Sequence, residues 1–517
     1  MEAAALGLLL AVWLWGLGRG RAARAAVILG ALGAAALTLW RTAPSAEGIA
    51  PGPPGLPGPS PDPALVTSAA CRACHPAAYA SWQASYHRTM TQPATPETVA
   101  GDFGGLVLSD RGTRLRLSRD GDAFLAHLLG PANEVQRTRR VVMTTGSHHF
   151  QNYWVAEDGG WYVQLPFLWR LDDRRWIPVQ DSFLHLDRAE PQPPAAWNGN
   201  CGYCHSVGHA GRLGPQSDPR VAELGVACEA CHGPGQAHVA HHRDPVARYL
   251  GRADAHDPIR VPSALSPALE QAVCGQCHGI FMRTDLAATH AQADRFRPGD
   301  ALSDSRQLLV PQPNPRPGGP LLVPPWGTPP QVTVTQGGDR WTAALLGLAA
   351  DGLYLRLPQA PTGPIEATIP AADGAPAFIA PGPSVPVVDG VVRIPLDPRW
   401  SNDPLAHVAR LMGWRGQTPT FFDLSAFWPD GTVRTTGRET NALATTGCAT
   451  RGDLTCSSCH AMHGYVERAD MLKPGVDGDA ACLQCHAADV PDAAAHSHHP
   501  AGSAGAACQN CHMPHTT

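Results

Sequence analysis

The stretch GVACEACHGPGQAH, Gly225 to His238, places two cysteines three positions apart and a histidine directly after the second. Paired cysteines of this kind occur in disulfide frameworks, in zinc sites and in haem attachment sites. The form C-x-x-C-H accounts for 14 of the 15 cysteines and occurs at residues 71–75, 201–205, 228–232, 274–278, 456–460, 482–486 and 508–512.

The histidine after each pair distinguishes between these kinds of site. A disulfide needs no histidine at a fixed position, and zinc ribbons use C-x-x-C units two at a time, whereas seven is odd. Histidine makes up only 24 of 517 residues, so chance does not explain seven repeats. C-x-x-C-H is the attachment signature of c-type haem, in which two thiols hold the porphyrin and the histidine binds its iron. The sequence therefore predicts seven covalently attached haem c groups.

The motifs also identify the residues that we expect to attach and ligate the haems. The cysteines expected to form thioethers are Cys71, Cys74, Cys201, Cys204, Cys228, Cys231, Cys274, Cys277, Cys456, Cys459, Cys482, Cys485, Cys508 and Cys511. The histidines expected to be proximal iron ligands are His75, His205, His232, His278, His460, His486 and His512.

Histidine is also the expected sixth ligand of most irons. Seventeen further histidines remain, against eight methionines, and several of them lie close to the motifs. Two histidine ligands also give lower reduction potentials than histidine with methionine. In the opening stretch, we expect His238 to reach the iron of a neighbouring haem rather than that of its own motif. The candidate distal ligands are His87, His148, His149, His238, His407, His463, His496, His499 and His515.

Several blocks of the chain resemble the multihaem cytochrome c552/c554 family, whose periplasmic members have doubled CXXCH units. The blocks are the opening stretch and CRACHPAAYASWQASYHRTM (71–90), GSHHFQNYW (146–154), WNGNCGYCHSVG (197–208), SAFWPDGTVRTTGRE (425–439) and HSHHPAGSAGAACQNCHMP (496–514). The resemblance covers most of 67–300 and 420–515. It implies electron transfer from haem to haem, with histidine ligands from these blocks.

The first 66 residues indicate export. Apolar runs at 3–18 and 25–40, separated by RGRAAR, predict an N-terminal transmembrane anchor over 1–40, with the arginines on the cytoplasmic side of a helical hairpin. Alternatively, the second run belongs to a cleaved signal peptide, which would leave a soluble periplasmic protein. In both cases the haem domains lie in the periplasm of a bacterium, anchored to the inner membrane in the first. The proline-rich residues 41–66 predict a semi-rigid stalk.

The motif spacing divides the rest of the chain. We expect a tetrahaem domain over 67–300, a haem-free β-rich insert over 301–400 and a trihaem domain over 401–517, whose motifs repeat every 26 residues. Alternating apolar residues around Asp-Gly and Gly-Gly turns also predict β-hairpins at about 98–190.

The expected fold class is thus an irregular multihaem cytochrome c, with mostly short α-helices around seven haems, β-rich inserts and the N-terminal anchor. Gly and Pro together are 104 residues, which favours short elements. The stretch SPALEQAVCGQCHG is the clearest helix, with Ser266 as its cap and Glu270 in the first turns.

The predicted function is electron transfer between a redox protein donor and acceptor that the sequence does not identify. The net charge of −5 provides no basic surface for nucleic acid. The alternative is a multihaem oxidoreductase for nitrogen or sulfur oxyanions or hydroxylamine, which requires one iron with an open position. All seven motifs end in histidine, which favours the carrier. Cys448, outside the motifs, is expected to be a buried free thiol.

Overall fold

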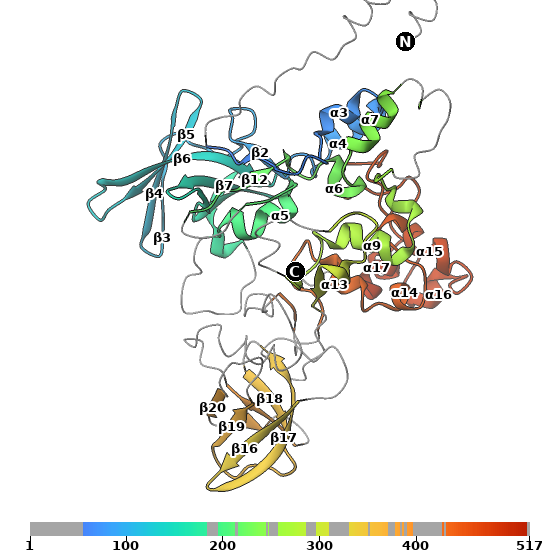
Figure 1. Cartoon of the computed structure of the whole chain (residues 1–517). Helices are drawn as coiled ribbons and strands as arrows, with labels where there is room; N and C mark the ends of the chain where they lie inside the picture. Colours follow the sequence, from blue (N-terminus) through green and yellow to red (C-terminus); the bar gives the residue numbers. More distant parts are fainter. Residues whose placement is uncertain are drawn as a thin grey trace, which may run out of the picture. The chain divides into compact units, whose positions relative to one another are not determined.

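The computed structural model (Figure 1) describes residues 55–182, 195–211, 216–244, 247, 257–285, 296–309, 330–349, 352–370, 378–382, 385–386, 390–395, 426–428 and 431–513. The predicted anchor, the first part of the stalk, His407 and His515 lie outside these ranges. Within them, no helix combines the length and apolar character needed to span a bilayer.

The end of the predicted stalk is part of the folded body. Strand β1 (Gly58–Pro59) pairs in parallel with β12 (Arg220–Val221), and Leu56 packs against the buried Trp197 and its neighbours. From Gly55 onward, therefore, the proline-rich segment lies on the protein surface instead of forming a spacer.

A nine-stranded antiparallel sheet occupies most of the first long interval between motifs. Its strands run in the order β10-β9-β7-β6-β5-β4-β3, with β2 paired to β6 and β8 to β7. Leu115, Leu117, Phe124 and Ala126 alternate with outward residues and are buried in its core, as expected for a half-buried sheet. The strands are β2 (Thr91–Pro93), β3 (Val107–Asp110), β4 (Thr113–Asp120), β5 (Ala123–Leu129), β6 (Val135–Thr145), β7 (Phe150–Glu157), β8 (Trp161–Gln164), β9 (Phe167–Arg170) and β10 (Arg175–Pro178).

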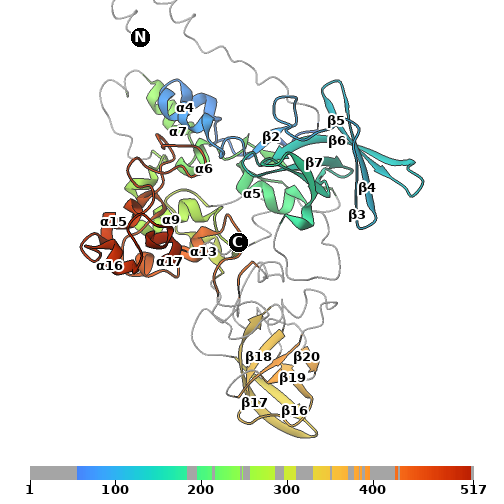
Figure 2. The same cartoon turned by 180° about the vertical axis from the view of Figure 1, so that it is seen from behind.

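A seven-stranded antiparallel sheet lies in the second long interval, in the order β20-β19-β16-β17-β18-β22-β21. Its first hairpin turns at Gly337 and Gly338, both with positive φ (56° and 101°), as a tight two-residue turn requires. Figure 2 shows this sheet in yellow and orange. Both sheets confirm the β-rich character predicted for the two intervals. The strands are β16 (Gln331–Gln336), β17 (Asp339–Ala349), β18 (Gly352–Arg356), β19 (Ile365–Ile369), β20 (Phe378–Gly382), β21 (Val385–Pro386) and β22 (Val391–Ile394).

The α-helices of the described ranges are short, as predicted, but strands predominate over helices there, so the described fold is β-rich and not mostly helical. The helices are α3 (Ser68–Arg72), α4 (Pro76–Ala84), α5 (Gly202–His205), α6 (Cys228–His232), α7 (Gln236–Arg243), α9 (Pro267–Gly275), α13 (Glu439–Leu443), α14 (Gly447–Thr450), α15 (Ala480–His486), α16 (Ala493–Ser497) and α17 (Cys508–His512). Between them lie 3₁₀ turns η1 (Val179–Asp181), η3 (Pro262–Ala264), η4 (Leu302–Asp304), η5 (Cys456–Ser458) and η6 (Ala504–Ala506), the π-turn η2 (Trp197–Cys201), and the strand pairs β11 (Ser206–Val207) with β13 (Glu223–Leu224) and β14 (Phe281–Arg283) with β15 (Arg306–Leu308).

Helix α9 begins where the sequence predicted. Ser266 is the N-cap residue and Pro267 the first helical residue, although the Ser266 side chain makes no capping hydrogen bond. Glu270 is buried, and its carboxylate accepts a hydrogen bond from the backbone N–H of Ser457 (3.1 Å). The acidic residue of the first turn thus joins this helix to the motif at 456–460.

Candidate haem-attachment sites

Each C-x-x-C-H motif includes a helical turn, which explains how its two thiols can reach one porphyrin. In three of the motifs, for example, the histidine N–H donates to the carbonyl of the first cysteine: His75 to Cys71, His278 to Cys274 and His460 to Cys456, each at 2.9 Å. One turn therefore separates the first cysteine from the histidine. All fifteen cysteines are free thiols.

Four motif histidines face a second histidine at a nearly constant spacing. An imidazole nitrogen lies about 2 Å from a metal that it binds, and the ring centre about 1 Å further, so two rings on opposite sides of one iron have centres about 6 Å apart. The observed ring centres are 6.1 to 6.3 Å apart. The pairs are His75 with His238, His278 with His87, His232 with His463, and His512 with His496.

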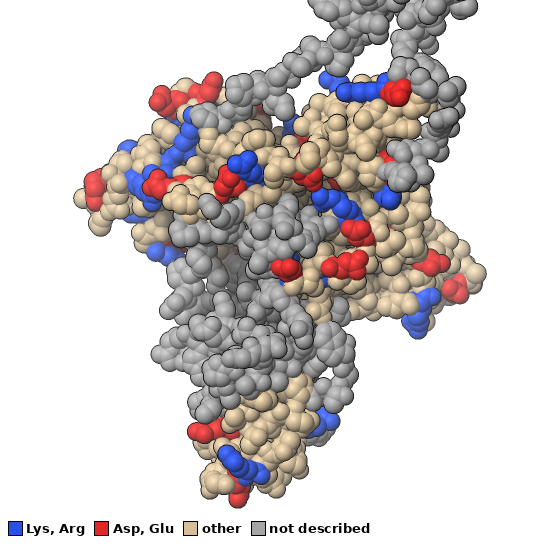
Figure 3. Space-filling view, viewed as in Figure 1, with Lys and Arg blue, Asp and Glu red and all other residues tan. Residues whose placement is uncertain are grey.

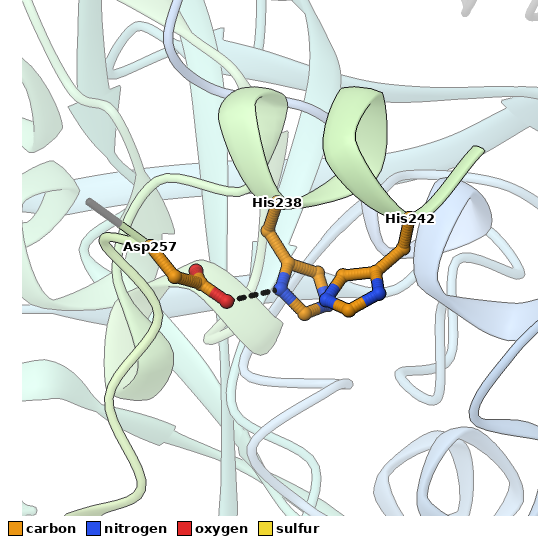
Figure 4. Close-up of side chains that lie close together, drawn as sticks. All are labelled: His238, His242 and Asp257. Atoms are coloured by element: carbon orange, nitrogen blue, oxygen red, sulfur yellow. Dashed lines mark hydrogen bonds and ion pairs between the residues drawn. The ribbon is translucent and has the colours of Figure 1, made fainter. Parts of the chain in front are cut away.

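The orientation of His238 fits an iron ligand. It projects from α7, and its Nδ1 lies 2.7 Å from a carboxylate oxygen of Asp257 (Figure 4). Because a carboxylate can only accept, Nδ1 is the donor, and Nε2 is left to bind a metal. His238 lies opposite His75, so it faces the neighbouring motif and not its own.

His238, Asp257 and His242, one turn further along α7, also form the single group of three metal-ligand side chains found within the described ranges (Figure 4). It contains no cysteine, and His242 is exposed. Within those ranges, no group of three metal-ligand side chains includes a cysteine of a motif.

The second pair depends on a half-buried histidine after α4, His87. The His87 carbonyl accepts from the N–H of Val226 (2.9 Å), and the Trp82 indole N–H donates to the Val226 carbonyl (2.8 Å). Burial, together with the nearby His278, lowers the pKa of His87 to about 4. A low pKa keeps the imidazole neutral, which is the form that binds iron.

On the other side of this pair, helix α13 supports His278. Its Nδ1 donates to the Glu439 carboxylate (2.8 Å), and the His278 carbonyl accepts from the Thr440 N–H (3.0 Å). Although partial burial opposes ionisation of Glu439, the hydrogen bond and charge of His278, together with backbone N–H donors that include Gly437, lower the pKa of Glu439 to about 2. The two side chains thus form a charge-assisted hydrogen bond.

The third pair brings together residues far apart in sequence. The loop that carries His463 is bound to Ser81 of α4, whose hydroxyl accepts from the Gly464 N–H (3.1 Å) and whose carbonyl accepts from the Tyr465 hydroxyl (2.9 Å). Opposite His463, the Nδ1 of His232 donates to the Arg260 carbonyl (2.8 Å).

The fourth pair is local. Asp492 caps α16, where its carboxylate accepts from the N–H groups of Ala494 and Ala495 (both 3.0 Å). The capped helix positions His496 opposite His512, whose motif is fixed by a hydrogen bond from the Cys508 N–H to Asp479 (2.8 Å).

The other three motif histidines have no partner ring at this spacing among the described residues. His205 is half-buried, and partial loss of hydration lowers its pKa to about 4. The Nδ1 of His460 donates to the Asp470 carbonyl (2.8 Å), and that of His486 to the Asp489 carboxylate (3.0 Å).

Three predicted distal ligands occupy other positions within the described ranges. The ring of His148 stacks on Tyr86 (4.3 Å between centres) and on His149 (3.8 Å), and His149 lies 3.7 Å from the Asp172 carboxylate. His499 packs over Gly505. None of the three faces a motif histidine at the spacing of the four pairs.

Two further results concern residues that sequence reasoning missed or placed wrongly. Asp257 and Glu439, which accept from His238 and His278, were not predicted, although Glu439 ends one of the blocks on which the family resemblance rests. Cys448 is exposed in α14, so the expectation of a buried thiol is wrong. Helix α14 is a single turn with no buried residues, so no neighbouring element covers the Cys448 thiol.

Contacts between motif residues connect the motifs into a series. The thiol groups in contact are Cys71 with Cys228, Cys204 with Cys277, Cys274 with Cys456, and Cys482 with Cys508. The Gln484 side chain donates to the Ser458 carbonyl (3.4 Å), and the Gln276 side chain donates to the Ala230 carbonyl (2.9 Å). The resulting spatial order of motifs is 71–75, 228–232, 274–278, 456–460, 482–486 and 508–512, with 201–205 beside 274–278.

Comparisons with known proteins identify two segments. The profile of the doubled CXXCH motif matches residues 448–491, and that of cytochrome c554 and c-prime matches residues 182–233. No curated protein is significantly similar in sequence.

Two solved structures are similar at low sequence identity. The outer cell wall cytochrome OcwA is 17% identical, with a TM-score of 0.31 over 47% of this chain and 45% of that one. An undecahaem cytochrome from the S-layer of Carboxydothermus ferrireducens is 14% identical, with a TM-score of 0.30 over 92% of this chain and 50% of that one. The chain thus spans about half the length of each.

Proposed function

We propose that this chain, a multihaem c-type cytochrome, carries electrons along seven covalently attached haems, most of which have two histidine ligands. The observation that carries the proposal is the spacing of the four histidine pairs, 6.1 to 6.3 Å between ring centres. We assign His87, His238, His463 and His496 as distal ligands on this basis.

The chain's own residues would perform three tasks in this function. Haem c, when attached, supplies an iron that takes up and releases one electron. Each histidine pair would hold one iron and would leave no ligand position open for a substrate. Acceptors such as Asp257 and the Arg260 carbonyl fix the imidazole rings through Nδ1. Contacts between cysteines of successive motifs, such as Cys71 and Cys228, keep the attachment sites close enough for transfer.

Partners and location follow from the same proposal. We infer that the chain exchanges electrons with redox proteins on the periplasmic side of a bacterial inner membrane, either anchored through residues 1–40 or released after cleavage. On the face shown in Figure 3, the described acidic and basic side chains are interspersed. We retain the division into domains at 67–300, 301–400 and 401–517 as part of this proposal.

Low-temperature EPR of the fully oxidised holoprotein, combined with haem quantitation, tests this function. Two histidine ligands give low-spin ferric iron, so a carrier should show low-spin signals that account for nearly all the haem. A high-spin signal equal to one haem per chain would indicate an open iron and favour the oxidoreductase. In that case, turnover of nitrite or hydroxylamine with a reduced dye would show whether the open iron is catalytic.

A further inference from the structure

The axial histidines differ in the kind of group that accepts their Nδ1 proton. Three of these acceptors are carboxylates. Glu439 accepts from the motif histidine His278, and Asp489 from the motif histidine His486. Asp257 accepts from His238, which faces the motif at 71–75. In two motifs the acceptor is a backbone carbonyl: Arg260 for His232 and Asp470 for His460. All five distances lie between 2.7 and 3.0 Å, so the acceptors differ in charge and not in contact.

The two kinds of acceptor alternate along the spatial series of motifs. At 71–75 the acceptor, on the facing histidine His238, is a carboxylate. On the motif histidines that follow in the series, the acceptor is a carbonyl at 228–232, a carboxylate at 274–278, a carbonyl at 456–460 and a carboxylate at 482–486. Helix contacts support the beginning of this order, since α3 touches α6, α6 touches α9 and α9 touches η5. The sequence order of the motifs does not produce the alternation, because 201–205 stands between the first two.

We propose that Asp257, Glu439 and Asp489 are positioning residues that lower the reduction potentials of alternate haems, so that potentials along the series rise and fall. A carboxylate that accepts from Nδ1 raises the basicity of the ligand and stabilises the ferric state more than a neutral carbonyl does. The proposal rests on the proposed function, because it assumes haem at each motif.

The solvent exposure of each carboxylate predicts the relative size of its effect on the reduction potential. The side chains of Asp257 and His238 are 27% and 24% exposed, whereas those of Glu439 and Asp489 are 66% and 72% exposed. Water and salt screen an exposed charge more strongly than a sheltered one. Asp257 should therefore have the largest influence and Asp489 the smallest.

The decisive variant is Asp257→Asn in the full-length holoprotein, which removes the charge at nearly constant size. We expect the reduction potential of one haem to rise by about 59 mV, which corresponds to a tenfold change in the equilibrium constant for one electron. The potentials of the other haems should not change. A variant that lacks the affected haem, Cys71→Ala with Cys74→Ala, identifies its reduction step in a spectroelectrochemical titration. Asp339→Asn, in the sheet that carries no motif, removes the same charge and should leave every step unchanged.

Three results would overturn the proposal. The first is an unchanged potential in Asp257→Asn. The second is a shift of equal size in Asp339→Asn, which would reflect net charge alone. The third is conversion of one haem to high spin in the EPR spectrum of Asp257→Asn, because Asp257 would then only hold His238 in place. Pyridine haemochrome quantitation separates these results from failure of the proposed function, since fewer haems in the parent protein would remove the premise itself.

Discussion

The buried side chain of Asn441 connects the region after the motif at 274–278 to helix α13. Its carboxamide oxygen accepts from the Ile280 N–H (2.7 Å), and its NH₂ group donates to the carbonyls of Ile280 (3.1 Å) and Leu309 (2.7 Å). Asn441 is 3% exposed, Ile280 6% and Leu309 0%. The residue therefore satisfies backbone groups that water does not reach.

The cost of Asn441→Ala can be worked out from these bonds. The Ile280 carbonyl keeps a second donor, the Leu309 N–H (2.9 Å), so two backbone groups lose their Asn441 partner, the Ile280 N–H and the Leu309 carbonyl. Each buried group left unsatisfied costs about 1–3 kcal/mol. We expect the free energy of unfolding to fall by about 4 kcal/mol, the midpoint of the resulting range of about 2–6 kcal/mol.

Two measurements check this expectation. Urea unfolding followed by tryptophan fluorescence gives the change in free energy, and hydrogen exchange read by mass spectrometry should show faster exchange in the peptide that contains Ile280. Asn152→Ala is the matched control, since Asn152 accepts one hydrogen bond from Gln164 at a half-buried site (2.5 Å) and should cost about 1 kcal/mol. A loss for Asn441→Ala no larger than for the control would refute the reasoning.

The remaining predictions concern the haem sites and their supports. His463→Ala should convert one haem to high spin in EPR without changing the haem count, because His463 faces the motif at 228–232. The control His127→Ala, in the nine-stranded sheet, should leave every haem low-spin. Identical spectra for the two variants would contradict the ligand assignment. Replacing Cys228 and Cys231 together with alanine should reduce the haem count by one, and an unchanged count would be inconsistent with attachment there. Trp82→Phe should lower the free energy of unfolding by about 1 kcal/mol through the lost indole hydrogen bond to the Val226 carbonyl, and no loss in urea unfolding would count against that contact.

The sequence was informative where the determining interactions are local. Two cysteines and a histidine within one helical turn define an attachment motif without reference to the rest of the chain, and adjacent glycines such as Gly337 and Gly338 specify a hairpin. The position of α9 follows from Ser266 and Pro267. His238 was also expected to face a neighbouring motif, and in the structure it lies opposite His75.

The pairing of histidine rings could not be predicted in this way, because it depends on tertiary contacts. His463 faces His232 only because Gly464 and Tyr465 bind Ser81 of α4, an interaction across most of the chain. His148 stands beside a second histidine in a conspicuous His-His pair, yet the structure uses its ring to stack on Tyr86. The acceptor Asp257 was missed for the same reason, since nothing in its immediate sequence distinguishes it from other aspartates.

The central claim is that seven haems are bound covalently to one chain. Pyridine haemochrome quantitation of protein produced in a host that matures c-type cytochromes, together with intact mass under denaturing conditions, tests it most directly. The account predicts seven haems that stay with the polypeptide after denaturation. Four or fewer per chain, or haem that separates from the denatured polypeptide, would contradict it.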